Sequence, residues 1–380
     1  MGSPYEDECI LPRPRGSVQT GHPLSGGTVL RTPMLRSLLI SLAAVLVAAP
    51  AAQAASPELT VMTRNVYLGG NIAGPIPAPN RDEFERSASA LWAAVRTTDF
   101  PARAKLLARE VRRTKPDVVG LQEVALWRRG PDAVKDGSAT PSTEIVYDFL
   151  ATLRSALGAR YRVASVQTAA DLEAPISDGY DVRLTMRDAV LVRVRRGLKV
   201  RRKLGDTYAA ELAVPTAIGA LTSTRGWVGA DLSLAGKRFR VVNTHLEAFS
   251  DPIRLQQARE LVAGPLRRRG TVILTGDINS DPVDATGADP AAYRKFTAAG
   301  LKDTWLAVRP RSKGFSCCFK TETIMDPPPA PFDHRVDHVF AKGRVRVLGG
   351  RVVGNDPANR TASGLWPSDH GGAVMTLRLR

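Results

Sequence analysis

Cysteine is scarce in this chain of 380 residues. It occurs at Cys9, Cys317 and Cys318, and no Cys/His group has zinc-site spacing, which excludes structural zinc as the basis of the fold. The adjacent pair in GFSCCFK precedes Asp337, so we expect it in a loop near the functional residues. Two forms stay open for it: a vicinal disulfide that stiffens the loop in an oxidising compartment, or two thiols that are reduced or paired between molecules.

Aromatic residues are also few, at 6% of the chain, and they are not interleaved with the basic runs. The sequence therefore shows no stacking platform for single-stranded nucleic acid. Acidic residues are outnumbered: without residues 1–54, 49 Lys and Arg remain against 34 Asp and Glu, a net charge of +15. Much of this charge lies at 193–196, 199–203 and 267–269. The excess favours nucleic acid, phosphorylated sugars or anionic lipid as partners, while solvated Arg-rich faces are the alternative interpretation.

The sequence has no hydrophobic run that makes a good membrane span. The segment 34–54 has a basic start at Arg36, a short Ala-rich apolar run and a small-residue pattern at 52–54. It predicts a signal peptide and export of the domain C-terminal to it, so that the protein is secreted or otherwise extracytoplasmic. Residues 1–33 are rich in Pro and Gly without periodicity, and are expected to be disordered or a miscalled upstream extension. The alternative is a genuine extension ahead of a signal anchor. Residues 55–380 are predicted to form one domain.

The stretch TVILTGDINSDP is the most informative feature that is present. Residues 272–274 indicate a strand buried on both faces, and Gly276 allows the backbone to turn. Asp277 and Asn279, two residues apart, then emerge on the same side of the chain. A carboxylate beside an amide at the end of a strand suits the positioning of a water molecule or a phosphate oxygen. Taken alone, the segment fits a structural loop equally well.

Four further segments end or open a strand with polar residues: LTVMTRN, PDVVGLQEV, FRVVNTH and the pair RVDHVFA with WPSDHGGAVMTLRL. A carboxylate that closes a buried strand is costly unless it is paired or holds a cation, so a metal ligand is expected in the second segment. The alternative there is a surface glutamate. The chemistry-bearing residues of the four segments are Asn65, Glu123, His245, Asp337, Asp369 and His370.

Strand-like and helix-like segments alternate along the chain. Helices are predicted over 102–113, 142–157 and 252–269, and a β-hairpin over 226–245 with its turn at 235–237. Parallel-type and hairpin elements together imply an α/β sandwich. Two further histidines near RVDH, His334 and His338, are expected to be loop and strand residues rather than ligands.

In this order, the five motifs resemble those of the endonuclease/exonuclease/phosphatase superfamily. These Mg²⁺-dependent phosphoesterases include pancreatic-type deoxyribonuclease, abasic-site endonucleases, inositol polyphosphate 5-phosphatases and bacterial sphingomyelinases. The resemblance covers residues 59–380, and GDIN, NTHL and SDH are its most diagnostic parts. It implies an α/β fold of two packed, mixed and mostly antiparallel β-sheets flanked by helices, a four-layer α/β/β/α sandwich. His245 argues against the abasic-site branch, which lacks that histidine.

The resemblance also implies a role for each residue. Mg²⁺, or Mn²⁺ as a substitute, is expected on Glu123, with Asn65 and Asp369 as further ligands. Asp337 is expected to orient His370. The general base stays open between His370 and the GDIN aspartate. The complete expected catalytic set is His245, Asp277, Asn279, Asp337 and His370.

One departure from the family and the choice of substrate stay open. Where many relatives carry Gly-Asn, this chain has Arg187 and Asp188, so that Arg187 either contacts the substrate phosphate or forms a structural pair that neutralises Asp188. A phosphodiester, first of all a nucleic acid, is the expected substrate of a monomer that needs no protein partner. A sphingomyelinase-like phospholipase C acting on a phospholipid head group, or an inositol or sugar phosphate phosphatase, is the alternative. The second alternative is a non-catalytic binding module with this fold.

Overall fold

The computed structural model describes residues 56–133, 141–283, 290–319, 321 and 323–380, which belong to one compact unit. The predicted extension (1–33) and signal peptide (34–54) lie outside the described residues. In the described ranges, no helix is long and apolar enough to cross a membrane.

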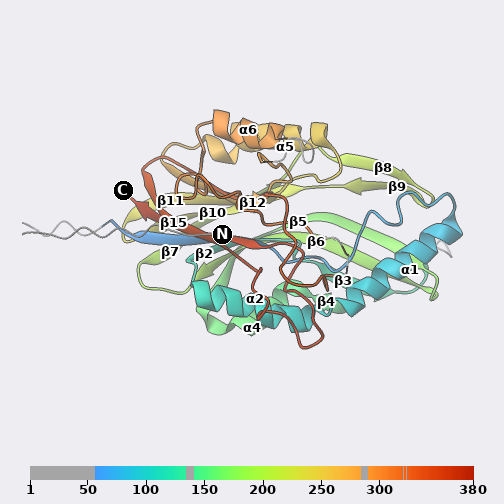
Figure 1. Ribbon diagram of the computed structural model, residues 1–380. Coiled ribbons are helices and arrows are strands. Elements are labelled where there is room, and N and C mark those ends of the chain that lie inside the picture. The colour runs from blue at the N-terminus through green and yellow to red at the C-terminus, as the bar shows by residue number, and fades with distance from the viewer. Residues whose placement is uncertain (1–55, 134–140, 284–289, 320, 322) are drawn as a thin grey trace, which may run out of the picture. The chain divides into compact units, whose positions relative to one another are not determined.

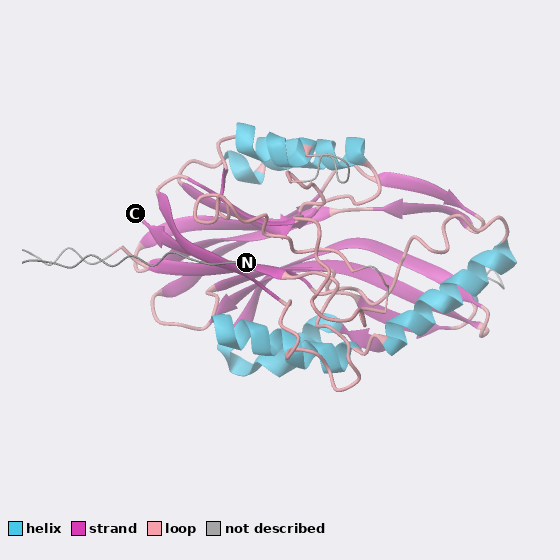
Figure 2. Cartoon of the chain, viewed as in Figure 1, coloured by secondary structure: helices cyan, strands magenta, loops and turns pink. Residues whose placement is uncertain are grey.

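Two mixed β-sheets form the centre of this unit (Figures 1 and 2). β1 (Glu58–Asn65) runs parallel to β2 (Val118–Gln122), and β11 (Lys237–His245) runs parallel to β12 (Thr271–Asp277). The other strand pairs of the described residues are antiparallel. The eight-stranded sheet has the order β15-β16-β1-β2-β6-β3-β4, with β5 paired to β6. Its strands are β1 Glu58–Asn65, β2 Val118–Gln122, β3 Leu126–Gly130, β4 Glu144–Asp148, β5 Tyr161–Ile176, β6 Tyr180–Arg193, β15 Val345–Val353 and β16 Gly372–Leu379.

The second sheet has six strands in the order β13-β14-β12-β11-β10-β7. Its strands are β7 Leu198–Thr207, β10 Gly226–Leu234, β11 Lys237–His245, β12 Thr271–Asp277, β13 Lys302–Asp303 and β14 Asp337–Lys342. A separate two-stranded ribbon consists of β8 Leu212–Thr216 and β9 Gly219–Ser223. The predicted hairpin over 226–245 is confirmed as β10 and β11. Its turn is made by Ala235 and Gly236, whose φ angles of 46° and 81° match the twist of the flanking strands.

Helices cover the outer face of each sheet, α5 and α6 on one side and α2 and α4 on the other (Figure 1). Each of α1, α2 and α4 starts at a residue whose side chain accepts a hydrogen bond from the first turn: Asn80, Asp99 and Asp148. The α-helices of the described residues are α1 Arg81–Thr97, α2 Phe100–Thr114, α4 Phe149–Leu157, α5 Asp251–Ala263 and α6 Ala291–Ala298.

The helix predicted over 142–157 is wrong in its first half. Glu144–Asp148 instead forms β4, paired with β3, and the helix begins only at Phe149. Asp148 explains the boundary, because its side chain accepts from the backbone N–H of Ala151 and caps the helix. The helical periodicity of the sequence therefore extends over residues that form a strand, and Asp148 is both the last residue of that strand and the N-cap of α4.

Three apolar clusters fill the spaces between four layers. One lies between the sheets, with Val61, Val190 and Ile273 fully buried. The second packs α1, α2 and α4 on the eight-stranded sheet, and the third packs α5 and α6 on the six-stranded sheet. The four-layer α/β/β/α sandwich with two mixed, mostly antiparallel sheets is thereby confirmed.

A small polar network interrupts the apolar layer between the sheets. The carboxamide of Asn243 on β11 accepts hydrogen bonds from Gln122 Nε2 (2.5 Å) and Thr275 Oγ1 (3.1 Å) and donates to the carbonyl of Leu121 (2.9 Å). Gly120 on β2 makes room for it: a Cβ there would lie 2.2 Å from Asn243 Oδ1 and 2.3 Å from Thr275 Oγ1. The close approach of the sheets at this point therefore requires glycine.

Gly120→Ala should destabilise the fold by at least about 1–3 kcal/mol, because the added methyl group has no space and the buried amide must move. Urea unfolding measures this loss. Gly349→Ala is the matched control, since nothing lies within 4 Å of a Cβ at that strand position. Equal unfolding midpoints for the two variants would refute the close-approach explanation.

Candidate active site

Two pairs of parallel strands deliver the predicted residues to one edge of the sandwich. β1 and β2 end side by side at Asn65 and Gln122, and β11 and β12 end side by side at His245 and Asp277. β14 begins at this edge too, with Asp337 in register opposite Asp277. A hydrogen bond of 3.1 Å from Asn65 Nδ2 to Asp277 Oδ2 joins the two sheets there. Residues that are far apart in sequence therefore meet.

An open cleft of about 310 Å³ lies at this edge, a size at the small end for ligand sites. Asn65 and Asp337 are buried behind it, hydrogen-bonded to residues that line it. No Lys or Arg of the described ranges lines the cleft, whereas Phe249 and Phe319 do. The predicted site residues among its lining are Glu123, His245, Asp277, Asn279, Asp369 and His370.

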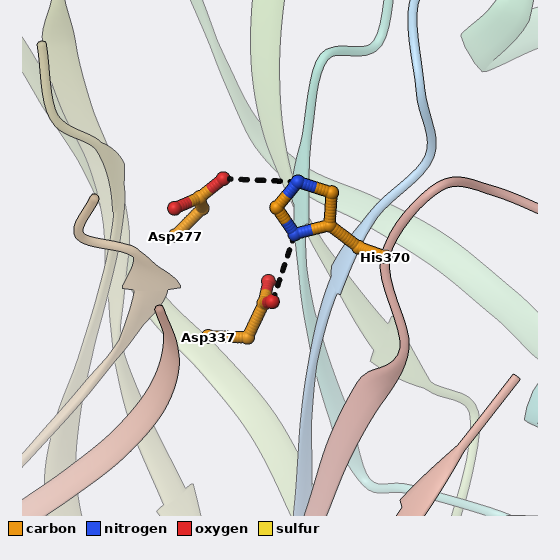
Figure 3. A group of neighbouring side chains, drawn as sticks. All are labelled: Asp277, Asp337 and His370. Atoms are coloured by element: carbon orange, nitrogen blue, oxygen red, sulfur yellow. Dashed lines mark hydrogen bonds and ion pairs between the residues drawn. The ribbon is translucent and has the colours of Figure 1, made fainter. Parts of the chain in front are cut away.

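The expected pair of Asp337 and His370 is confirmed. His370 Nδ1 lies 2.8 Å from Asp337 Oδ2, and His370 Nε2 lies 3.7 Å from Asp277 Oδ2 (Figure 3). Ser316 Oγ donates a second hydrogen bond to Asp337 Oδ2 at 2.7 Å and fixes the carboxylate. Burial opposes protonation of the imidazole, but Asp337, Asp369 and Asp277 outweigh it and raise the pKa of His370 well above its usual value. The neighbouring carboxylates therefore favour the protonated form of His370.

The GDIN segment places Asp277 at the centre of the site. The pKa of its carboxyl is raised to about 7, mainly by burial; the charge of His370 opposes this rise and the charge of Asp337 adds to it. The backbone N–H of Asn279 donates to Asp277 Oδ1 at 3.0 Å. Asn279 has a φ of 48°, in the left-handed region that Asn tolerates, and its side-chain amide donates to the carbonyl of Leu246. The amide is thus held in place by the adjoining loop.

Glu123 and Asp369 form the acidic side of the cleft. Asn65 Nδ2 donates to Glu123 Oε1 at 2.9 Å, and the backbone N–H of Leu68 donates to Oε2 at 2.8 Å. Burial raises the pKa of Asp369 to about 6, and the charge of Glu123 contributes. Within the described part of the chain, neither carboxylate forms an ion pair with a Lys or Arg side chain. Carboxylates gathered in this way favour a bound cation.

The donor set can be tested against a divalent metal. Ligand atoms of Asp277, Asp337 and His370 all lie within 4.8 Å of one another, an arrangement consistent with a metal site. Glu123 and Asp369 supply further carboxylate oxygens in the same cleft, the ligand type that Mg²⁺ prefers. The residues present therefore fit a divalent cation.

His245 has a partner that the sequence did not reveal. Arg225 Nη1 lies 3.0 Å from His245 Nδ1, and His245 Nε2 lies 3.6 Å from Asp277 Oδ2. Burial, together with the charges of Arg225 and His370, lowers the pKa of His245 well below its usual value. Arg225 comes from the connection between β9 and β10, which carries no motif, and only the paired strands bring it to the histidine.

Arg187 does not line the cleft. Its guanidinium donates to the carbonyls of Val124 and Ala125 and forms an ion pair of 2.6 Å with Asp148. Of the two interpretations left open for Arg187, the substrate contact is not supported and a structural ion pair is present. The partner in that pair is not Asp188, whose buried carboxyl has its pKa raised to about 7 by desolvation.

The cysteine pair and the two extra histidines have defined places. Cys317 and Cys318 form a disulfide, Cys318 lines the cleft, and Cys317 Sγ lies 3.5 Å from His370 Nε2. His338 is buried in β14, as expected, and its ring stacks on Phe340. His334 forms an isolated β-bridge with Cys317. The vicinal bridge, left open by the sequence, is thus the form that the structure contains.

The basic runs lie towards the other ends of the strands. Lys203 is in register with Ala230 and Val241, four residues before His245 on β11, which is roughly 13 Å along the strand. Lys199 lies farther still, and Arg193 pairs with Asp117 just before β2 begins. These charges therefore do not supply the floor of the cleft.

Mg²⁺ or Mn²⁺ should raise the thermal unfolding temperature, because a ligand that binds only the folded state stabilises it, by about 2.7 kcal/mol at 100 times its Kd. Asp369→Asn should reduce this shift, and titration calorimetry should show weaker binding. Glu144→Gln is the control, since Glu144 is exposed and paired with Arg129. An unchanged melting temperature with either metal would contradict a cation site.

The chain matches the sequence profile described as "Endonuclease/Exonuclease/phosphatase family" over residues 71–370. Among the curated proteins, none matches it in sequence. One similar solved structure is an endonuclease/exonuclease/phosphatase family protein from Bacteroides thetaiotaomicron, with a TM-score of 0.54, 18% identity, and 86% of this chain and 99% of that chain covered. Another is a mannosyl-6-phosphatase from Bacteroides thetaiotaomicron VPI-5482, with a TM-score of 0.52, 18% identity, and 84% and 99% covered.

A third similar structure, from Leptotrichia buccalis C-1013-b, has a TM-score of 0.52, 16% identity, and 84% and 100% of the two chains covered. Identities this low carry the fold and no substrate. The family profile spans most of the chain, and its activity at the level of the family is metal-dependent phosphoester hydrolysis. The chain belongs to the endonuclease/exonuclease/phosphatase family.

Proposed function

We propose that this protein hydrolyses a phosphodiester by in-line attack of water, with Mg²⁺ bound by Glu123, Asp369 and Asn65. The observation that carries the proposal is the convergence of these residues with Asp277, Asp337 and His370 on one cleft. When bound, Mg²⁺ would neutralise charge on the phosphate and act as a Lewis acid. The non-catalytic binding module is the weaker proposal, since each motif keeps its polar residue.

The residues of the chain divide the work between them. Asp337 holds Nδ1–H of His370, so that Nε2 faces the cleft and takes a proton from the attacking water. Asp277 and Asn279 position the water or the leaving oxygen. His245 donates from its ring to the phosphoryl group as negative charge develops there. Asp277, with a pKa raised to about 7, is the other candidate base.

The cleft favours a compact substrate with a single phosphate. Its described lining has aromatic and acidic side chains but no Lys or Arg, and the basic runs lie elsewhere. Burial against Phe249 or Phe319 suits an apolar or aromatic group next to the ester. The net charge of the chain would suit a polyphosphorylated sugar or a nucleic acid bound by the basic runs. The lining of this cleft gives those two substrates less support. Export through the segment 34–54 and a monomeric state remain part of the proposal.

Glu123→Gln should abolish hydrolysis, with a loss of at least about 100-fold in kcat, while the melting temperature in EDTA stays within about 2 °C, since a strand-end ligand contributes little to the core. Activity is measured on bis(p-nitrophenyl) phosphate, DNA, sphingomyelin and mannose 6-phosphate, with Mg²⁺ or EDTA. Glu144→Gln serves as the control. Full activity of Glu123→Gln, or in EDTA, would remove the metal from the mechanism. Faster hydrolysis of DNA than of the other substrates, most marked at low salt, would instead indicate that the protein is a nuclease.

Asp337→Asn should lower kcat by about 100- to 1000-fold with little change in KM, because the amide keeps the shape but no longer favours the Nδ1–H form of His370. Steady-state kinetics on the best substrate of the panel separates the two parameters. Ser316→Ala removes the second hydrogen bond to Asp337 Oδ2 and the bond that Ser316 Oγ accepts from the backbone N–H of Asp337, and it should have a smaller effect because His370 keeps its carboxylate partner. A rise in KM at constant kcat would instead assign Asp337 to substrate binding.

A further inference from the structure

Arg225 is almost completely buried beside the cleft. It precedes β10, 5% of its surface is exposed, and its Nη1 points at Nδ1 of His245, 3.0 Å away. The other ring nitrogen of His245, Nε2, faces the cleft and lies 3.6 Å from Asp277 Oδ2. The imidazole is thus held between a guanidinium behind it and the reacting groups in front.

The chemistry of the partner decides where the proton of this ring sits. A guanidinium has N–H donors and no acceptor, so His245 Nδ1 must offer its lone pair. An imidazolium carries N–H on both nitrogens and cannot accept this bond. The ring is therefore neutral, with its one proton on Nε2 and directed into the cleft.

We propose that Arg225 is a positioning residue that fixes His245 as the neutral Nε2–H form, which donates one hydrogen bond into the cleft. The acceptor of that bond, a phosphoryl oxygen, rests on the proposed function. The state of the ring rests on the contact with Arg225 alone. His245 then supplies a fixed donor and transfers no proton of its own.

Arg225 is itself held by a buried carboxylate. Glu247 is fully buried, and its Oε2 lies 3.6 Å from Arg225 Nε. Ser223 Oγ donates to the same carboxylate at 2.8 Å, and the backbone N–H of Phe249 donates at 3.0 Å. Because every member is buried or bonded, the guanidinium cannot swing away without leaving a charge unpaired.

The two cleft histidines consequently have opposite polarity. His370 Nδ1 faces the carboxylate of Asp337, so its Nε2 carries the lone pair in the neutral ring and accepts a proton. His245 Nδ1 faces a guanidinium, so its Nε2 carries the hydrogen. Both Nε2 atoms lie within 3.7 Å of the same oxygen of Asp277. In the neutral ring, Nε2 of His370 is an acceptor because Nδ1 faces a carboxylate, and Nε2 of His245 is a donor because Nδ1 faces a guanidinium.

Nitrogen-15 NMR of the ¹⁵N-histidine-labelled, metal-free protein tests this directly, since two-bond proton–nitrogen correlations show which ring nitrogen bears hydrogen. His245→Asn assigns the resonances. At neutral pH the wild type should show Nε2–H with Nδ1 bare. Arg225→Met should shift His245 towards Nδ1–H or the doubly protonated ring, and Arg225→Lys, which keeps a donor and a charge, should restore the Nε2–H form.

Kinetics provides the second readout. Arg225→Met should lower kcat by about 10- to 100-fold with less than about a threefold change in KM, and Arg225→Lys should recover part of it. Because Arg225→Met leaves Glu247 unpaired and can unfold, the double variant Arg225→Met/Glu247→Gln is measured with it. Arg240→Met is the matched control: Arg240 lies on the same strand as His245 but pairs with Asp231.

Hydrogen on Nδ1 of His245 in the wild type, or an unchanged ring form in a folded Arg225→Met variant, overturns the proposal. The spectra do not depend on turnover. If none of the substrates is hydrolysed while the ring forms follow the expectation, the proposed function fails and the role of Arg225 stands.

Discussion

The polar network around Asn243, between the two sheets, is the constraint on which the site depends. Asn65 and Glu123 come from the eight-stranded sheet or its loops, whereas His245, Asp277 and Asp337 come from the six-stranded sheet. An apolar interface alone tolerates small slips between sheets, because dispersion contacts are non-directional. A buried amide bonded to both sheets does not, since a shift leaves donors and acceptors unpaired in a low-dielectric layer.

Two buried arginines fix the backbone next to the cleft through hydrogen bonds to its carbonyl groups. Arg103 donates to the carbonyls of Val66, Tyr67 and Pro367, and Arg64 donates to those of Asn65 and His370. Each guanidinium thus ties the loop after β1 to the loop before β16. Arg64 is neutralised by Glu110, at 3.0 Å, which keeps its charge off the acidic cleft. These shared donors hold the end of β1, with Asn65, against the segment that carries Asp369 and His370.

Motif residues at strand ends could be predicted from sequence because a strand leaves little freedom in where its last side chain points. This holds for Asp277 and His245, and the order of the motifs indicated the layered fold. The partners of these residues could not be predicted in the same way. Arg225 and Glu247 meet only through the pairing of β10 with β11, and no local pattern marks either residue. The misassigned helix over 142–157 shows the same limit, since pairing with β3 outweighs helical periodicity in 144–148.

Charge runs were the least informative feature, for a related reason. A run records which residues are adjacent in sequence, whereas a binding site requires them to be adjacent in space and directed at the ligand. Asp117 forms ion pairs with Arg193 and Arg195, and Asp231 forms ion pairs with Arg240 and Arg268. Part of the positive charge is therefore neutralised within the fold. The cleft has the reverse character, with carboxylates whose pKa values are raised by burial and by one another. On the proposed function, an anionic ester would be attracted to that cleft by a divalent cation held there and by donors such as the ring of His245, rather than by the net charge of the chain.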